Sequence, residues 1–319
     1  MNASVIGVDV GGTKCAVVLG SLRGEILKRE QFPTGAGRGC IQVLGDITAA
    51  IDRVREAAMS DVLAISVSIG GPLDVLRGVI LNPPHLPGWN HVPLKEILSD
   101  RFNLPIYIEH DGNAGALAEW YFGSGRGVQN LIFLTMGTGF GGGLILNGRL
   151  YRGTSDVAGE VGHIRIAEDG PECYGKRGSL EGYASGTGIA LLAREHYPSR
   201  YGPETTSQSL YAEYREGQPE AKKVFERAAF HLGRGFAILA DLLNPERIIL
   251  GGLGIRAFDA LIKPALLVYE REALPEARHA CTIVPAALGE SIGDYASLCA
   301  AFDQGGLFEV TQAPNVGEK

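Results

Sequence analysis

The chain carries one pattern twice: an apolar strand that ends in a glycine-rich turn and leads into a second strand. Residues 4–10 precede the first turn, and residues 131–136 precede the second. Helical apolar spacing follows each pattern, most clearly in residues 41–54 and 221–243. Alternating strands and helices are typical of an α/β fold. We therefore expect two α/β lobes that face a central cleft.

The expected domain division follows from this repeat. A small α/β domain should cover residues 1–118, and a larger one should cover residues 119–293. A last helix, expected at about residues 294–303, should pack back on the small domain. Residues 304–319 are mostly polar and are expected to form a loose tail.

Charge and cysteine content exclude several classes of function. The net charge of -7 over 319 residues argues against broad electrostatic binding of nucleic acid. The five cysteines are dispersed and odd in number, which indicates free thiols in a reducing compartment. The chain has neither a start typical of a signal peptide nor a run of about 18 apolar residues that could span a bilayer. We expect a cytoplasmic protein without nucleic-acid or membrane partners.

The first glycine turn combines a carboxylate with flexible backbone, in the sequence Asp9-Val10-Gly11-Gly12-Thr13-Lys14. Two glycines allow backbone N–H groups to approach a phosphate closely. The Thr13 hydroxyl adds a donor, and Asp9 could hold Mg²⁺ directly or through water. A tight hairpin turn would explain the same residues without a ligand.

The second glycine turn is the run Gly137-Thr138-Gly139-Phe140-Gly141-Gly142-Gly143. It has more glycine than a turn needs, although a hairpin with a bulge is the alternative. Two such loops, one in each lobe, favour a phosphate group that both loops bind. A later strand, residues 247–250, leads into Gly251 and Gly252, which could bind an adenosine or simply begin a helix.

Two further places carry ionisable groups. Asp111 lies where a strand gives way to an alanine-rich helix, and the positive helix end favours the ionised carboxylate that a general base needs. An ordinary helix N-cap is the competing interpretation. Glu160, His163 and Glu181 could together bind several hydroxyl groups. Surface charge and a structural histidine are the alternatives for these three.

In this order and spacing, the motifs resemble those of the ROK family of sugar kinases and repressors, within the hexokinase–actin-like superfamily. The resemblance extends from Ile6 to about Ala300. It rests on Asp-x-Gly-Gly-Thr-Lys at residues 9–14, Gly-Thr-Gly-x-Gly-Gly-Gly at 137–143, Ala-Gly-Glu-x-Gly-His at 158–163 and Leu-Glu at 180–181. It implies a two-lobed actin/hexokinase-like fold, of the ribonuclease H-like type.

The resemblance also implies a function. A ROK kinase transfers a phosphoryl group from ATP, with Mg²⁺, to a sugar hydroxyl, usually the C6 hydroxyl of a hexose as in a glucokinase. Asp111 would then be the base, and the sugar would be bound by residues 71, 85, 110, 160, 163 and 181, that is Gly71, His85, His110, Glu160, His163 and Glu181. The larger domain would carry sugar-binding and interface helices, since a homodimer is expected by analogy.

One departure from the family concerns zinc. Relatives often have a Cys-x-Cys-Gly-x-x-Gly-Cys motif, and here its cysteine positions hold Glu172, Tyr174 and Ser179. His163 and Cys173 would supply at most two of the four ligands of a structural zinc. The sequence therefore predicts no zinc.

The other departures concern the sugar. Asparagines that contact the sugar in relatives are replaced here by His85 and His110. The hypothesis is a pocket for a modified hexose, such as an N-acetylhexosamine, in place of glucose. Three other interpretations stay open: a transcription regulator, for which no DNA-binding segment precedes Asp9; a sugar-binding or sensing protein that has lost catalysis; and a kinase that uses polyphosphate as donor.

Overall fold

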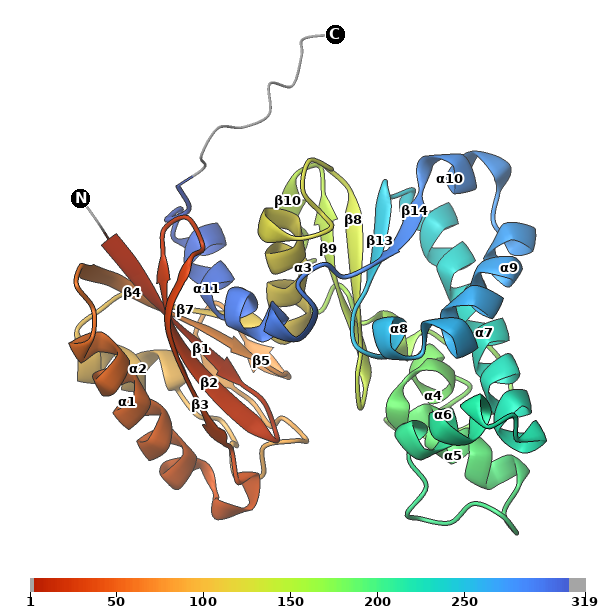
Figure 1. The fold of residues 1–319 in the computed structure, drawn as a ribbon. Coiled ribbons are helices and arrows are strands. Elements are labelled where there is room, and N and C mark those ends of the chain that lie inside the picture. Colours follow the sequence, from red (N-terminus) through yellow and green to blue (C-terminus); the bar gives the residue numbers. More distant parts are fainter. Residues whose placement is uncertain (1–2, 310–319) are drawn as a thin grey trace, which may run out of the picture. The chain divides into compact units, whose positions relative to one another are not determined.

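The structure, a computed structural model, describes residues 3–309, which form two compact units (Figure 1). Unit 1 contains the residues up to Gly127 and those from Glu290 onward, and unit 2 is Val128–Gly289. The boundary predicted near residue 118 lies inside helix α3, and unit 1 continues beyond the end of this helix. Of the predicted tail, residues 310–319 lie outside the described residues.

Unit 1 is built on a five-stranded sheet in the order β3-β2-β1-β4-β7. The first three strands are antiparallel, whereas β4 and β7 run parallel to β1. The strands are β1 (Ala3–Val10), β2 (Lys14–Ser21), β3 (Ile26–Pro33), β4 (Asp61–Ile69) and β7 (Ile106–His110), and a small hairpin of β5 (Leu73–Asp74) and β6 (Val79–Ile80) follows β4.

Helices cover both faces of this sheet. One face packs on α1 (Cys40–Glu56) and α2 (Leu94–Phe102), through a core that includes Ile6, Val8 and Ile47. The other face packs on α11 (Ile292–Gln304), which also contacts α3 (Asp111–Phe122). Gly7 makes this approach possible, because a Cβ there would lie 2.2 Å from Ser297 Oγ. A short 3-10 turn, Ala36–Arg38, precedes α1.

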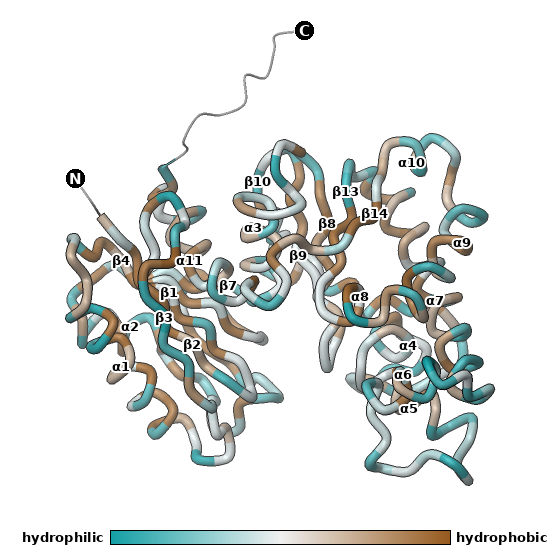
Figure 2. Tube along the Cα trace, in the orientation of Figure 1, coloured by the Kyte–Doolittle hydropathy of each residue, from teal (hydrophilic) through white to brown (hydrophobic). Residues whose placement is uncertain are grey.

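Unit 2 repeats the strand order in a second sheet, β10-β9-β8-β13-β14. Again three strands are antiparallel, and β13 and β14 run parallel to the central β8. Figure 2 shows hydrophobic stretches along β8 and β13. The strands are β8 (Leu131–Met136), β9 (Phe140–Leu146), β10 (Arg149–Leu150), β13 (Arg247–Leu250) and β14 (Thr282–Pro285).

The remaining elements of unit 2 are mainly helices around α7, whose Phe225 and Phe236 are fully buried. They are α4 (Leu180–Ala184), α5 (Gly186–His196), α6 (Ser207–Arg215), α7 (Pro219–Leu243), α8 (Leu253–Arg256), a π-helical turn (Phe258–Ile262), α9 (Lys263–Glu272) and α10 (Pro275–Ala280). A 3-10 turn (Val161–His163) and the hairpin of β11 (Glu172–Cys173) and β12 (Lys176–Arg177) precede α4, and a 3-10 turn (Gly289–Ser291) leads into α11.

The repeated strand–turn–strand pattern of the sequence thus corresponds to the central hairpin of each sheet, β1–β2 and β8–β9. No helix among residues 3–309 is long and apolar enough to cross a membrane.

Candidate active site

In unit 1, the sheet brings Asp9 and Asp111 to the same edge. Asp9 is paired with Ser68 on β4, and Ser68 is paired with Glu109 on β7. Since these three strands are parallel, their carboxyl ends meet at one edge, where ligands of α/β sheets bind. Asp111 follows β7 directly as the first residue of α3.

The Asp9 carboxyl lies in an unfavourable environment for a negative charge. Burial, together with the carboxylates of Asp111 and Asp294, raises its pKa to about 6, although Lys14 and Arg29 act in the opposite direction. The first turn of α11 lies against it, since a Cβ at Gly293 would be 2.6 Å from Asp9 Oδ2.

This carboxylate environment fits Mg²⁺. Oxygen donors are the ligands that Mg²⁺ prefers, and a cation would relieve the repulsion between Asp9 and its acidic neighbours. Among residues 3–309 there is no group of three or more His, Cys, Asp or Glu side chains that could hold a metal ion by themselves. Proteins commonly bind Mg²⁺ through one or two carboxylates plus water and substrate phosphates, so Asp9 suffices for such a site.

The first glycine turn closes the β1–β2 hairpin. Gly11 N donates to Lys14 O at 3.1 Å, and Thr34 holds the turn from outside through its hydroxyl, which donates to Gly11 O at 2.6 Å. The Gly11 amide is therefore used within the hairpin turn, as the alternative interpretation of this motif predicts. A Cβ at Gly12 would lie 2.9 Å from His85 Cβ, so the turn and His85 are in contact.

The N-cap of α3 is His110, and the expectation that Asp111 serves as the cap is wrong. His110 Nδ1 accepts from Gly112 N at 3.3 Å, while Asp111 lies one position further, inside the helix. The same amide donates to Asp111 Oδ1 at 2.7 Å, which holds this carboxylate at the helix N-terminus. The Asp111 side chain is 54% exposed, so it is accessible to a substrate.

His110 and Gly71 form a second contact of this edge. A Cβ at Gly71 would lie 2.7 Å from His110 Cδ2, so the imidazole lies directly over the glycine. Three of the residues that were predicted to bind the sugar, Gly71, His85 and His110, therefore belong to unit 1 together with Asp111.

In unit 2, the second glycine turn is held by α4 and α5. Glu181 Oε2 accepts from Phe140 N at 2.9 Å. Gly186 N donates to Gly137 O at 2.8 Å, and Thr187 N donates to Thr138 O at 3.1 Å. Glu181, predicted as a sugar ligand, thus has one carboxylate oxygen on the glycine loop.

Glu160 and His163 lie on the turn that packs against the strand after this loop. Gly162 fits there because a Cβ would lie 2.0 Å from Phe140 O. Both side chains are exposed, and the His163 carbonyl accepts from Lys176 Nζ at 2.8 Å. The turn that carries Glu160 and His163 and the carboxylate of Glu181 therefore both lie against the backbone of Phe140.

A cavity of about 690 Å³ opens beside the glycine loop, entirely within unit 2. Its volume suits a nucleoside. Gly251 and Gly252 place α8 at this cavity, because Gly252 has φ +60 and a Cβ there would lie 2.1 Å from Met136 O. The wall includes Gly137, Thr138, Thr187, Ser207, Tyr211 and Arg256. Sequence reasoning missed the last four, which lie outside the motifs on α5, α6 and α8.

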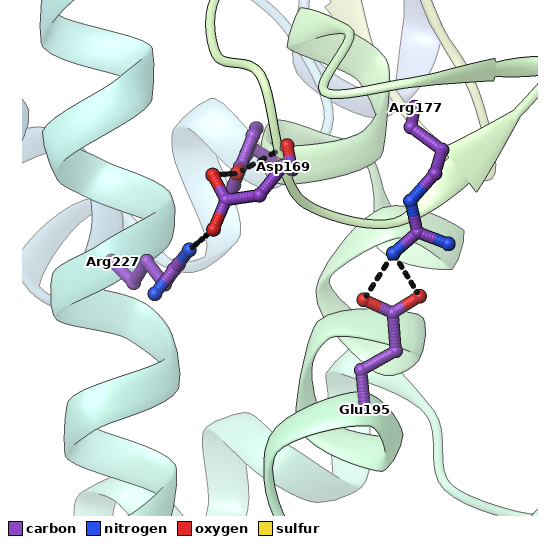
Figure 3. Close-up of polar contacts among 5 residues, drawn as sticks. Asp169, Arg177, Glu195 and Arg227 are labelled. Carbon is purple, nitrogen blue, oxygen red and sulfur yellow. Dashed lines mark hydrogen bonds and ion pairs between the residues drawn. The ribbon is translucent and has the colours of Figure 1, made fainter.

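The segment that carries the zinc motif in relatives is held here by ion pairs (Figure 3). Asp169 pairs with Arg227 of α7, and Arg177 pairs with Glu195 of α5. Cys173 is buried, and burial, with the nearby Glu181, Glu172 and Glu195 carboxylates, raises the pKa of its thiol to about 11. A high thiol pKa disfavours the thiolate that zinc requires. The absence of zinc stays a prediction.

Comparisons with known proteins agree on one family. The model of the ROK family matches residues 5–301. A glucokinase from Halalkalibacterium halodurans is 34% identical over 303 residues, which cover 90% of this chain and 92% of the relative. The chain belongs to the ROK family.

Solved structures agree on the fold. A ROK hexokinase from Thermus thermophilus superposes with a TM-score of 0.85 at 31% identity, covering 95% of this chain and 99% of the other. A ROK family glucokinase from Streptomyces griseus, in complex with glucose and AMPPNP, gives a TM-score of 0.76 at 31% identity, again covering 95% and 99%. The expected actin/hexokinase-like α/β fold is confirmed.

Proposed function

We propose that this protein transfers the terminal phosphoryl group of ATP to a sugar hydroxyl, with the C6 hydroxyl of a hexose as the acceptor. It is a sugar kinase of the ROK family. The observation that carries the proposal is the pair Asp9 and Asp111 at the carboxyl edge of parallel strands, directly beside the first glycine turn. Phosphoryl transfer depends mainly on positioning and on neutralising charge, and this edge supplies groups for both tasks.

In the proposed reaction, Asp111 accepts the proton of the attacking hydroxyl. The hydroxyl oxygen forms a bond to the γ-phosphorus, the bond to the β–γ bridging oxygen breaks, and ADP leaves. Glu160, His163 and Glu181, with Gly71, His85 and His110, bind the sugar. The Asp111 carboxylate suits a base because it is exposed, so that a substrate hydroxyl can reach it, and because the Gly112 amide holds it in place.

The phosphates of ATP are assigned to the two glycine turns, which offer backbone N–H groups and the hydroxyls of Thr13 and Thr138. Lys14 adds positive charge at the first turn. The cavity beside Gly137, lined also by Arg256 of the helix that follows Gly251 and Gly252, receives the nucleoside. Asp9 would hold Mg²⁺ directly or through water, and bound Mg²⁺ neutralises phosphate charge. Burial and the neighbouring carboxylates raise the pKa of Asp9 to about 6, and a bound cation would oppose both effects.

The test is an ADP-release assay with Asp111→Asn. A general base contributes about 100- to 10,000-fold, so we expect kcat to fall by about 1,000-fold while the KM values change little. Asp100→Asn removes an exposed carboxylate from α2 and serves as the control. Wild-type turnover by Asp111→Asn would overturn the assignment of the base.

A second candidate keeps the reaction and changes the acceptor to a modified hexose, such as an N-acetylhexosamine. It is favoured by His110, which lies over Gly71, and by His85, which contacts Gly12, both at positions where relatives have asparagine. A panel of glucose, mannose, glucosamine, N-acetylglucosamine and N-acetylmannosamine separates the two candidates. The same panel with polyphosphate in place of ATP tests the donor.

We also propose a cytoplasmic homodimer. ATP is a cytoplasmic donor, and all five cysteines are unpaired in the structure, as in proteins of reducing compartments. Sedimentation in solution tests the dimer, which rests on the resemblance to ROK kinases.

A further inference from the structure

Glu109 is a buried carboxylate that the proposed reaction does not use. It is the penultimate residue of β7, two residues before Asp111, and its exposure is 0%. A buried carboxylate is costly unless donors satisfy it. It cannot touch a substrate, so any effect on the reaction must act through other residues.

The hydrogen bonds of Glu109 enclose the turn that carries Asp111. Its Oε1 accepts from His110 N at 3.0 Å and from Asn113 Nδ2 at 3.0 Å. One oxygen therefore binds the residue immediately before Asp111 and the residue two positions after it. The strand end and the first turn of α3 are fixed to each other on both sides of the proposed base.

The second oxygen of Glu109 connects this turn to α11. Gln304 Nε2, at the end of α11, donates to Glu109 Oε2 at 3.3 Å and to Ile108 O at 2.9 Å. The first turn of the same helix lies against Asp9, through Gly293. Helix α11 thus contacts Asp9, the proposed metal ligand, through its first turn. At its last residue, Gln304, it contacts the turn that carries Asp111, the proposed base.

We propose that Glu109 is a positioning residue that sets the direction of the Asp111 carboxylate for proton transfer, with Asn113 and Gln304 as its partners. This inference rests on the proposed function, in which Asp111 is the base. Displacing a reacting group by about 1 Å can cost about 100-fold in rate, so loss of the Glu109 contacts should lower kcat more than substrate binding.

The decisive variant is Glu109→Gln, which keeps the size of the side chain but turns one acceptor into a donor facing other donors. We expect kcat to fall about 10- to 100-fold, with the KM values for sugar and ATP within about 2-fold of wild type. Gln304→Met leaves Glu109 intact and removes one donor, so a smaller loss of kcat, about 3-fold, is expected.

Glu119→Gln is the matched control. Glu119 is also 0% exposed and lies on α3, but it accepts from Ser124 N at 2.7 Å near the opposite end of the helix. Its substitution should lower the melting temperature as much as Glu109→Gln does and leave kcat unchanged. Equal loss of kcat in both variants would show a general packing effect and overturn the inference.

A double-mutant cycle separates this inference from the proposed function. In Asp111→Asn, the further change Glu109→Gln should have no additional effect on kcat, because the group that it positions is gone. Full additivity would overturn the positioning role. If Asp111→Asn itself kept wild-type turnover, the proposed function would be wrong. An inactive Asp111→Asn with a fully active Glu109→Gln would refute only the inference.

Discussion

The two units present different chemistry on sheets of the same strand order. Unit 1 places carboxylates at the ends of its parallel strands, with Asp9 and Asp111 close enough for each charge to affect the other. Unit 2 places a glycine loop at the corresponding hairpin, and Gly137 and Thr138 of this loop line a cavity. The sheet therefore determines where a functional group lies. The residues at the end of each strand determine whether that place carries a charged side chain or backbone hydrogen-bond donors.

The ionisable groups that the two units bury also differ in their pKa shifts. The pKa of Asp9 in unit 1 is raised to about 6. His231 in unit 2 stacks on Tyr183 with ring centroids 3.8 Å apart, and burial, with the charges of Arg227 and Arg234, lowers its pKa to about 4. The two groups therefore give the units opposite dependences of stability on pH.

Of the three variants that test this contrast between the units, Asp9→Asn should have the largest effect. We expect kcat/KM with Mg²⁺ to fall about 100-fold, since the variant removes the proposed metal ligand. The same variant should raise the free energy of unfolding by about 1–3 kcal/mol at pH 7 and not at about pH 3, where the Asp9 carboxyl is mostly protonated in both the folded and the unfolded state. The ADP-release assay and urea unfolding at the two pH values measure the effects.

The direction in which the pKa of Asp9 is shifted determines how its contribution to stability changes with pH. A pKa that is higher in the folded state contributes stability below the unfolded value, and that contribution is lost as pH rises from about 4 through 6. Asp9→Asn with unchanged activity would contradict the assignment of a functional carboxylate.

The next prediction concerns His231 and the dependence of stability on pH in unit 2. The lowered pKa of His231 contributes stability above about pH 6.5, and this is lost as pH falls toward 4. Because of this histidine, the wild type should lose about 2 kcal/mol of unfolding free energy as pH falls from 6.5 to 4. His231→Phe should not show this loss. Hydrogen exchange read separately on β8 and β1 amides locates the effect. A change confined to unit 1 would contradict the assignment to His231.

The smallest of the three effects in this comparison tests the glycine loop. A Cβ at Gly137 would meet no atom within 4 Å, so Gly137→Ala should leave the melting temperature unchanged. We expect the KM for ATP to rise about 10-fold, because the methyl group occupies the side from which a phosphate approaches the backbone. Gly45→Ala on α1 also meets no atom within 4 Å and serves as the control without kinetic effect. An unchanged KM for ATP would contradict a phosphate site at Gly137.

Much of the fold could be predicted because its signals are local. The strands 4–10 and 131–136 consist mostly of apolar residues, and the helix at 221–243 has a clear period. The helical apolar spacing of residues 257–272 predicts one helix, whereas residues 258–262 form a π-helical turn before α9 begins. Strand β14 was not predicted, because four residues of edge strand carry too little periodicity.

The candidate site also contains some residues that the sequence could predict and others that it could not. Asp9 and Asp111 could be singled out because Asp9 lies at the end of one recognisable strand and Asp111 directly follows another. Glu109 and Gln304 could not be paired from sequence, since 195 positions separate them and no spacing rule relates a strand end to the end of a distant helix. The cavity wall, with Thr187, Ser207 and Tyr211, likewise comes from separate helices.

The order of residues alone determined the doubled hairpin motif, the helices that follow it and the positions of the glycines, because these depend on neighbours along the chain. Only the tertiary structure decided that α11 returns to Asp9, that His110 rather than Asp111 caps α3, and that Asp169 and Arg177 find partners on α7 and α5. Long-range contacts and the fields of buried charges depend on distances through space, and those exist only once the chain has folded.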